Sequence, residues 1–129
     1  MLEAIQKIIS EALGPDIEMQ VDENASPNAV IIEKQHLLQI ANLLYGHPEL
    51  YFDMLSCITG IDNGVEAASM TIAYNFYSIP FEKSLMLKVE IPRDIDTEIP
   101  SLTSIWKTAN WHEREIFDLL GVTFKDHPD

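Results

Sequence analysis

Two neighbouring segments of strict alternation constrain the fold more than any other feature of the chain. Residues 70–77 alternate Met, Ile, Tyr and Phe with smaller or polar residues, and residues 84–91 alternate leucine, Val89 and Ile91 with polar residues and Met86. Successive side chains of a strand point to opposite faces, so each segment is predicted to be a strand with one buried face. The short connection 78–83 contains Pro80. The two strands are therefore predicted to form an antiparallel hairpin.

The rest of the chain supplies helices and further strands around this hairpin. Helical spacing of apolar residues predicts a first helix over residues 2–13, which Gly14 and Pro15 end, and a second helix over residues 34–45, which Gly46 ends. Strands are predicted at residues 17–21, 29–32 and 51–61, and a short helix at residues 100–108. With a last helix after residue 110, the order is α-β-β-α-β-β-β-α-α. We predict one α+β domain over residues 1–129, a two-layer structure with a mixed sheet of about five strands and helices packed on one face.

Composition excludes several classes of function. The formal net charge is −13 and the eight basic residues are scattered, which argues against nucleic-acid binding and against anionic membranes. No apolar run of about 18 residues exists, so no membrane span is expected. The first residues lack the basic and then apolar pattern of a signal peptide, which favours a cytoplasmic protein. Cys57 is the only cysteine, so neither an internal disulfide nor a self-contained iron–sulfur cluster is expected.

The segment from Asn110 to Pro128 is the most distinctive part of the sequence. We expect Asn110 to cap a short helix, with Glu113 completing a capping box, and Gly121 to end it in a left-handed conformation. Arg114 and Asp118 are four residues apart and can pair along this helix. Its predicted apolar face consists of Ile116, Phe117, Leu119 and Leu120, with Trp111 near the start. The mixture of aromatic and charged residues indicates a recognition surface or a buried polar junction.

No pattern in the sequence indicates chemistry of its own. His112-Glu113 begins like the zinc-protease motif, but Ile116 stands where the second histidine is required. There is no nucleophile elbow, no glycine-rich phosphate loop and no histidine placed near Cys57 in sequence. A metal site at Asp126, His127 and Asp129 is a weak alternative, because further ligands are lacking. We therefore predict no catalytic, cofactor-binding or metal-binding residue.

The same C-terminal segment resembles the signature of the 30-kDa subunit of respiratory complex I, known in bacteria as the C subunit of NADH-quinone oxidoreductase. The resemblance covers about residues 50–129 and includes Pro100-Ser101 and Ile105-Trp106 upstream. The residues in register with the signature are Trp111, Glu113, Arg114, Glu115, Asp118, Gly121, Phe124, His127 and Pro128. Two departures stand out: Asp126 replaces the usual Gly before His-Pro, and the chain stops at Asp129 where the family continues into a leucine and two arginines. We therefore expect the chain to be truncated at its C-terminus.

The resemblance implies a non-catalytic subunit of the peripheral arm of a proton-translocating NADH:quinone oxidoreductase. Such a subunit binds no cofactor itself, whereas FMN and iron–sulfur clusters lie in partner subunits. It packs against the large quinone-site subunit and cluster-bearing subunits on the cytoplasmic side of the inner membrane, as a peripheral protein of the respiratory chain. We expect Trp111, Glu113, Arg114, Glu115 and Asp118 to form the junction with the partner, and His127-Pro128 to direct the C-terminal tail along it.

Three alternatives stay open. The first is the homologous subunit of a membrane-bound hydrogenase or formate-hydrogen lyase complex. The second is a free-standing acidic interaction domain without a redox partner. The third is a small metal-dependent hydrolase with a metal at residues 126–129.

Overall fold

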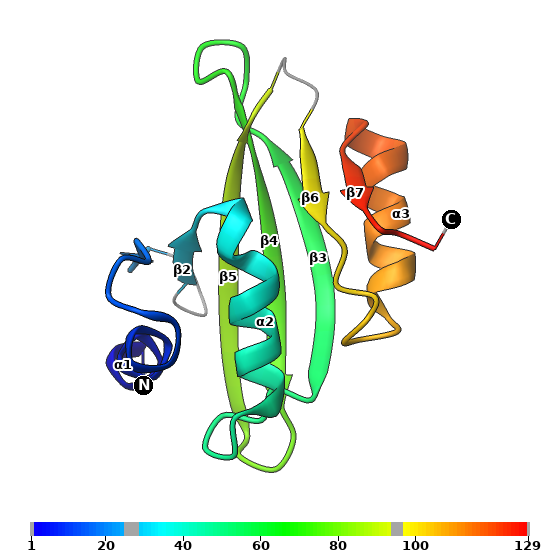
Figure 1. The fold of residues 1–129 in the computed structure, drawn as a ribbon. Helices are drawn as coiled ribbons and strands as arrows, with labels where there is room; N and C mark the ends of the chain where they lie inside the picture. The colour runs from blue at the N-terminus through cyan, green and yellow to red at the C-terminus, as the bar shows by residue number, and fades with distance from the viewer. Residues whose placement is uncertain (1, 25–28, 94–96, 129) are drawn as a thin grey trace.

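A computed structural model describes residues 2–24, 29–93 and 97–128 of the chain (Figure 1). Along the sequence the elements are α1 (Leu2–Leu13), β1 (Gln20–Asp22), β2 (Ala29–Ile32), the 3-10 turn η1 (Lys34–His36), α2 (Leu37–Gly46), β3 (Met54–Asp62), β4 (Ser69–Ser78), β5 (Lys83–Pro92), β6 (Glu98–Pro100), α3 (Ala109–Leu120) and β7 (Thr123–Lys125).

The predicted hairpin forms the centre of a five-stranded mixed sheet. β4 and β5 pair antiparallel over their whole length, from Ser69 opposite Pro92 to Ser78 opposite Lys83. The strand order is β1-β2-β5-β4-β3, in which only the contact between β2 and β5 is parallel. The prediction of a mixed sheet of about five strands is confirmed.

The helices cover one face of this sheet. α2 crosses in front of the central strands and α3 lies beside β3 at the edge (Figure 1). The alternating apolar residues of β4 and β5 are buried on the covered face, together with Ile5 and Ile9 of α1 and Leu37, Ile40 and Leu44 of α2. Burial of such side chains is the main stabilising contribution to the fold, about 1.5–3 kcal/mol for each large residue. The α+β two-layer class is confirmed.

Gly60 of β3 allows α3 to approach the sheet. A Cβ atom at Gly60 would lie 2.5 Å from Cδ1 of Leu120 and 3.0 Å from Cδ1 of Ile116. These two side chains therefore occupy the space that any larger residue at position 60 would need. The absence of a side chain at position 60 thus lets Ile116 and Leu120 of α3 pack directly against β3.

Two local predictions differ from the structure, and one strand was not predicted. The predicted helix at residues 100–108 is wrong: Glu98–Pro100 is the strand β6, and the following residues make a single turn in which Leu102 O accepts from the N–H groups of Ile105 and Trp106. The strand β7 was not predicted, and it pairs in parallel with β6, with Ile99 opposite Phe124. The strand predicted at residues 17–21 is observed as β1, which begins only at Gln20.

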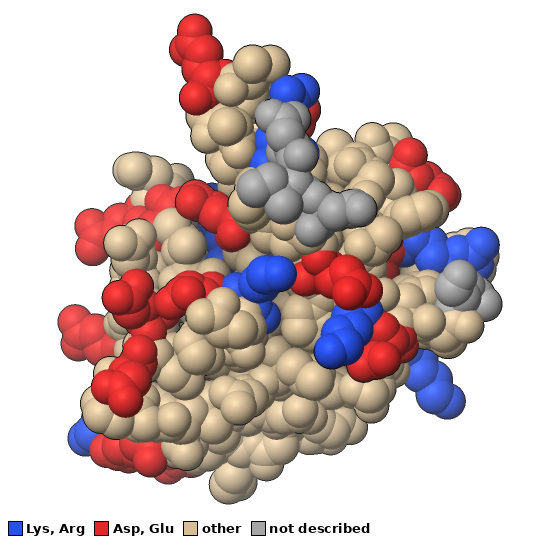
Figure 2. Space-filling model, turned by 45° about the horizontal axis from the view of Figure 1, so that its top comes forward, with Lys and Arg blue, Asp and Glu red and all other residues tan. Residues whose placement is uncertain are grey.

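Acidic residues are spread over the surface. Figure 2 shows Asp and Glu side chains over much of the visible face, with Lys and Arg scattered among them and no continuous basic area on that face.

Candidate functional site

Glu113 lies on the inner side of α3 and is completely buried. Its Oε1 accepts a hydrogen bond from the Ser101 hydroxyl at 2.7 Å, and its Oε2 accepts one from the Leu102 N–H at 2.8 Å. Ser101 Oγ also lies 2.8 Å from Thr103 Oγ1, so the hydroxyls form a short chain. Buried carboxyl groups need such partners, since an unpaired polar group is costly in the interior. Glu113 therefore ties α3 to the segment that follows β6.

This arrangement corrects the predicted capping box. The residue before α3 is Thr108, which makes no side-chain cap, and Asn110 lies inside the first turn. Glu113 bonds Ser101 and Leu102 in place of the helix N-terminus. Because its carboxylate accepts from the Leu102 N–H, Glu113 holds the loop after β6 in place and does not cap its own helix.

Burial changes the titration of the two acidic groups inside this region. It raises the pKa of the Glu113 carboxyl, while the Ser101 and Leu102 hydrogen bonds and the charge of His127 act in the opposite direction. Burial and then the Glu113 charge raise the pKa of the Tyr74 hydroxyl well above its ordinary value. Among the described residues the Tyr74 hydroxyl has no hydrogen-bond partner.

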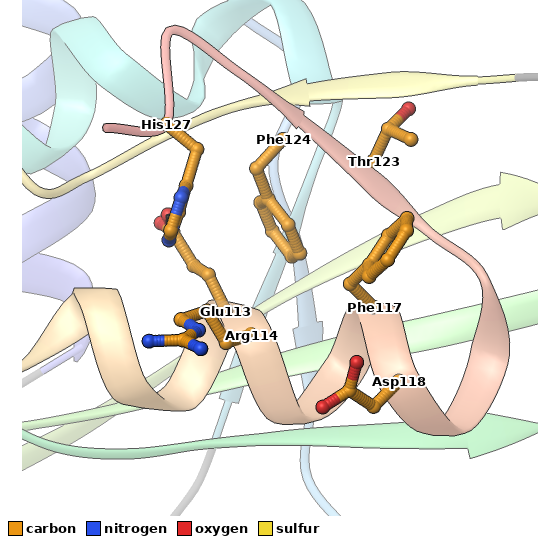
Figure 3. A pocket seen from close by; sticks show the side chains of 7 residues that line it. All are labelled: Glu113, Arg114, Phe117, Asp118, Thr123, Phe124 and His127. Atoms are coloured by element: carbon orange, nitrogen blue, oxygen red, sulfur yellow. Dashed lines mark ion pairs between the residues drawn. The ribbon is translucent and has the colours of Figure 1, made fainter. Parts of the chain in front are cut away.

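The C-terminal segment folds back onto the first turn of α3. Asp126 takes a left-handed conformation with φ of 67°, and the chain reverses there. Nε2 of His127 lies 3.3 Å from the backbone oxygen of Asn110 and 3.9 Å from Oε1 of Glu113. Figure 3 shows the imidazole pointing from this segment toward Glu113. His127 thus belongs to the internal network, whereas Pro128 is exposed.

α3 exposes large apolar side chains on its outer side, at Trp111, and on its two flanks, at Phe117 and Leu119. Trp111 is 71% exposed, Phe117 51% and Leu119 79%. The predicted apolar face is therefore only partly correct, because Ile116 is buried and Leu120 half-buried while Phe117 and Leu119 face outward. Helix geometry explains the division, since only Ile116 and Leu120, four residues apart, share the side that meets β3.

Charged residues lie among these exposed side chains. Arg114, Glu115 and Asp118 are exposed on the same outer side. The Arg114 guanidinium lies 5.6 Å from the centroid of the Trp111 ring, a distance typical of a cation–π contact. Arg and Trp are the residue types that most often dominate the energetics of protein interfaces. The outer side of α3 has the composition of such an interface.

A recess of about 350 Å³ separates α3 from β7 (Figure 3). Side chains of both elements and of the C-terminal segment line it: Glu113, Arg114, Phe117, Asp118, Thr123, Phe124 and His127. In the described part of the chain no group of three His, Cys, Asp or Glu side chains is placed to bind a metal ion, and Asp129 of the alternative metal site lies outside that part. Thr123 is the one hydroxyl residue in the lining and no cysteine is present. The recess is thus lined by charged, aromatic and hydroxyl side chains of α3, β7 and the C-terminal segment.

The signature residues thus separate into two sets. Trp111, Arg114, Glu115 and Asp118 are exposed together, whereas Glu113 and His127 lie inside. Gly121 ends α3 at φ of 73°, as predicted, and its N–H bonds Phe117 O at 2.8 Å.

The sequence interpretation missed Ser101 and Leu102 as the hydrogen-bond partners of Glu113, and Tyr74 as a buried residue whose pKa the Glu113 charge raises. One signal for it was available, because Glu113, Ile116 and Leu120 follow helical spacing and so share one side of the helix.

Known proteins match this chain over a range that includes α3 and the C-terminal segment. Residues 30–129 match the model of the family described as "Respiratory-chain NADH dehydrogenase, 30 Kd subunit". The NADH-quinone oxidoreductase C 2 subunit of Rhizobium etli is 35% identical over 98 residues, which are 76% of this chain and 51% of that protein. The NADH-quinone oxidoreductase C subunit of Chloroherpeton thalassium is 34% identical over 129 residues, which are 98% of this chain and 52% of that protein. The chain spans about half the length of these relatives.

Two solved structures share the fold. A trypsin-resistant fragment of Nqo5 gives a TM-score of 0.75 at 20% identity and covers 99% of this chain and 97% of the fragment. A chain of the membrane-bound sulfane sulfur reductase, an archaeal respiratory membrane complex, also gives 0.75, at 22% identity, and covers 98% of this chain and 71% of that one. At these identities the likeness concerns the fold alone. The matched residues 30–129, which contain the whole signature helix, show that this chain belongs to the family of the 30 Kd subunit of respiratory-chain NADH dehydrogenase.

Proposed function

We propose that the chain acts as a non-catalytic subunit in the peripheral arm of a proton-translocating NADH:quinone oxidoreductase, where it helps to assemble the quinone-reducing module. The outer side of α3 carries the proposal, because a rigid helix there exposes Trp111, Arg114, Phe117 and Leu119 on a chain of this family. Relatives named as C subunits of NADH-quinone oxidoreductases favour NADH as the electron donor of the complex.

The proposed partners are the large quinone-site subunit and the cluster-bearing subunits of the arm. In this proposal the chain binds no cofactor, and FMN and iron–sulfur clusters belong to those partners. Two observations support this division: Cys57 is the only cysteine, and the described residues contain no candidate metal-binding group. The role of the chain is then to help hold the partner subunits in position, because electron transfer needs cofactors held at fixed positions by the surrounding protein.

The proposed location is the cytoplasmic side of the inner membrane, as a peripheral part of the complex. None of the described helices is long and apolar enough to cross a membrane, which is compatible with attachment through partner subunits. Burial of Trp111 and Phe117 against a partner would remove the largest exposed apolar side chains of α3 from water.

A second candidate is the corresponding subunit of a membrane-bound complex that uses another electron donor or acceptor. The shared fold with a chain of the sulfane sulfur reductase favours keeping this candidate. Affinity purification of the tagged full-length protein from detergent-solubilised membranes of its own organism distinguishes the two. A cluster-rich complex that reduces quinone with NADH supports the first, and one that oxidises hydrogen or formate, or that reduces sulfane sulfur, supports the second. An iron-free eluate of this chain alone contradicts both.

The Arg114→Ala variant tests the role of the α3 surface within that experiment. Arg114 is exposed, so the free energy of unfolding should change by no more than about 0.5 kcal/mol. Recovery of partner subunits should fall, because the guanidinium over Trp111 would be lost from the interface. Lys7→Ala on α1, also an exposed basic residue, is the matched control. Equal recovery with Arg114→Ala and Lys7→Ala would refute the role of α3 in docking.

A further inference from the structure

Exposed large apolar side chains gather at one end of the sheet, away from the outer side of α3. Ten such side chains occur among the described residues. Three belong to α3 and two to the β3–β4 end. The other five, between 40% and 58% exposed, are Tyr45, Tyr51, Met54, Ile79 and Phe81, which we call the end patch. Single exposed apolar residues are normal, whereas five of them on the elements that meet at one end of a sheet favour an interaction site.

The residues of the end patch lie on two connections that are held together and on the helix and strand ends next to them. Figure 1 shows the α2–β3 connection and the β4–β5 turn side by side at the bottom of the view. Asp53 Oδ1 accepts a hydrogen bond from the Ile79 N–H at 3.0 Å and so holds the two connections together. The rings of Tyr45 and Tyr51 are 6.0 Å apart, and Met54 pairs with Tyr77 at the start of β3.

A hollow opens beside these side chains. Its volume is about 380 Å³, and it lies between α1 and the two connections. Phe81 and Lys83 line it from the hairpin, Ala4 and Ile8 from α1, and the buried Phe52 from the start of the β3 segment. An exposed aromatic rim next to an apolar hollow is the arrangement in which interface hot spots form, since a partner side chain there is surrounded by apolar atoms.

The acidic charge of the two connections indicates which kind of partner would bind the end patch. Glu49, Asp53 and Glu82 are acidic and Lys83 alone is a cation, on a chain with net charge −13. Anionic lipid headgroups would be repelled by this rim, whereas Lys or Arg of a protein would be attracted. We propose that the end patch is a second docking surface, which receives a protein partner presenting an apolar side chain flanked by basic residues.

Two residues of the same connections have a positive φ, which is often found at binding surfaces. Tyr51 and Glu82 have φ of 39° and 51°, in the left-handed region that favours Gly and Asn. Such conformations are retained where surrounding structure fixes them, often at binding sites. With docking at both α3 and the end patch, the chain would join two neighbours. This proposal extends the proposed function and rests on it only for the identity of the complex.

The test compares two charges at one exposed position in the tagged full-length protein, purified from membranes as above. Ile79→Lys places a cation against a basic partner, whereas Ile79→Glu adds to the acidic rim. The backbone N–H that bonds Asp53 stays in both variants. Val65→Lys at the opposite end of the sheet, where Val65 is 75% exposed, is the matched control. Tyr51→Asn removes an exposed aromatic ring while suiting the left-handed backbone, so it should not unfold the chain.

We expect Ile79→Lys and Tyr51→Asn to lower the recovery of at least one subunit about tenfold, Ile79→Glu to lower it less because only the apolar contact is lost, and Val65→Lys to leave it near the wild-type level. The lost subunit should differ from the one lost with Arg114→Ala. Equal recovery for all variants overturns the second docking surface while leaving the proposed function intact. Binding of the wild-type chain to phosphatidylglycerol vesicles that Ile79→Glu weakens and Ile79→Lys does not also overturns it, in favour of a lipid surface. A recovered complex without iron or flavin overturns the proposed function instead. In that case the recovery of partner proteins with Ile79→Lys and Ile79→Glu still shows whether the end patch is a docking surface. A wild-type chain recovered alone overturns both.

Discussion

Removal of the Glu113 carboxyl should destabilise the domain strongly, and its replacement by an amide should not. In Glu113→Ala the Leu102 N–H loses its acceptor inside the protein, which costs about 1–3 kcal/mol. The Ser101 hydroxyl keeps Thr103 Oγ1 at 2.8 Å, so its loss is smaller, about 0.5–1.5 kcal/mol. The space left by a completely buried side chain adds to the cost, while release of a desolvated carboxyl offsets part of it. The expected decrease in the free energy of unfolding is about 2–4 kcal/mol.

Glu113→Gln keeps both partners. The amide oxygen can accept from the Leu102 N–H, and the amide NH₂ can donate to Ser101 Oγ, which in turn donates to Thr103. The decrease should stay below about 1 kcal/mol. Urea unfolding followed by tryptophan fluorescence measures both variants, since the buried Trp106 reports on this region. A loss with glutamine as large as that with alanine would refute the assignment of these hydrogen bonds.

The same pair of variants tests the effect of pH. Burial raises the pKa of Glu113, so the folded protein binds this proton more tightly than the unfolded chain. The unfolded chain releases it near pH 4.3, about the ordinary value for Glu. As pH rises from there to the raised pKa, the folded state holds more protons and the free energy of unfolding falls. Glu113→Gln should lack this fall. Parallel pH profiles of the two proteins between about pH 4 and 7 would contradict the raised pKa.

Two further substitutions test the core of the site. Tyr74→Phe removes a buried hydroxyl without a partner among the described residues, so it should leave stability unchanged or raise it by about 1 kcal/mol in thermal unfolding. A clear loss would mean that the hydroxyl is bonded. Gly60→Val should lower stability by about 1–3 kcal/mol, because its side chain would overlap Leu120 and displace α3. Gly46→Ala at the end of α2, where no atom lies within 4 Å of the added Cβ, is the control and should be neutral. Equal effects of the two glycine changes would refute the close approach of α3.

The elements that the sequence predicts well are those whose signal is local. The hairpin of β4 and β5 follows from alternation inside each strand and a short turn between them, and its extent agrees within two residues at each end. The prediction of a helix at residues 100–108 was wrong because a residue outside that segment determines its conformation. Glu113 accepts a hydrogen bond from the Leu102 N–H, and the backbone there forms a turn. The strand β7 has three residues and pairs in parallel with β6, so neither its length nor its pattern marks it in the sequence.

Helical spacing places Glu113 on the side of Ile116 and Leu120, but the sequence could not show that this side meets the sheet, for a related reason. The signature residues were found from their order in the sequence, but their division between inside and outside depends on how α3 is rotated against β3. That rotation is set by Gly60, which admits Ile116 and Leu120, and by the two hydrogen bonds of Glu113. The end patch has no sequence signal, since the exposure of Tyr51 or Ile79 follows only from the packing of two connections.

The internal network and the exposed surface of α3 depend on each other. Glu113 and Trp111 are two residues apart, so they project on nearly opposite sides of the helix. The bonds from Ser101 and Leu102 fix Glu113 inward and thereby hold Trp111 and Arg114 outward in one orientation. Side chains ordered before binding lose less conformational entropy on association. Glu113→Ala should therefore weaken docking even under conditions in which the variant stays folded, although Glu113 itself touches no partner. Substitutions at Arg114 should weaken docking alone. If Glu113→Ala, assayed well below its unfolding midpoint, recovered partner subunits as fully as the wild type, the internal network would be a stabilising feature only.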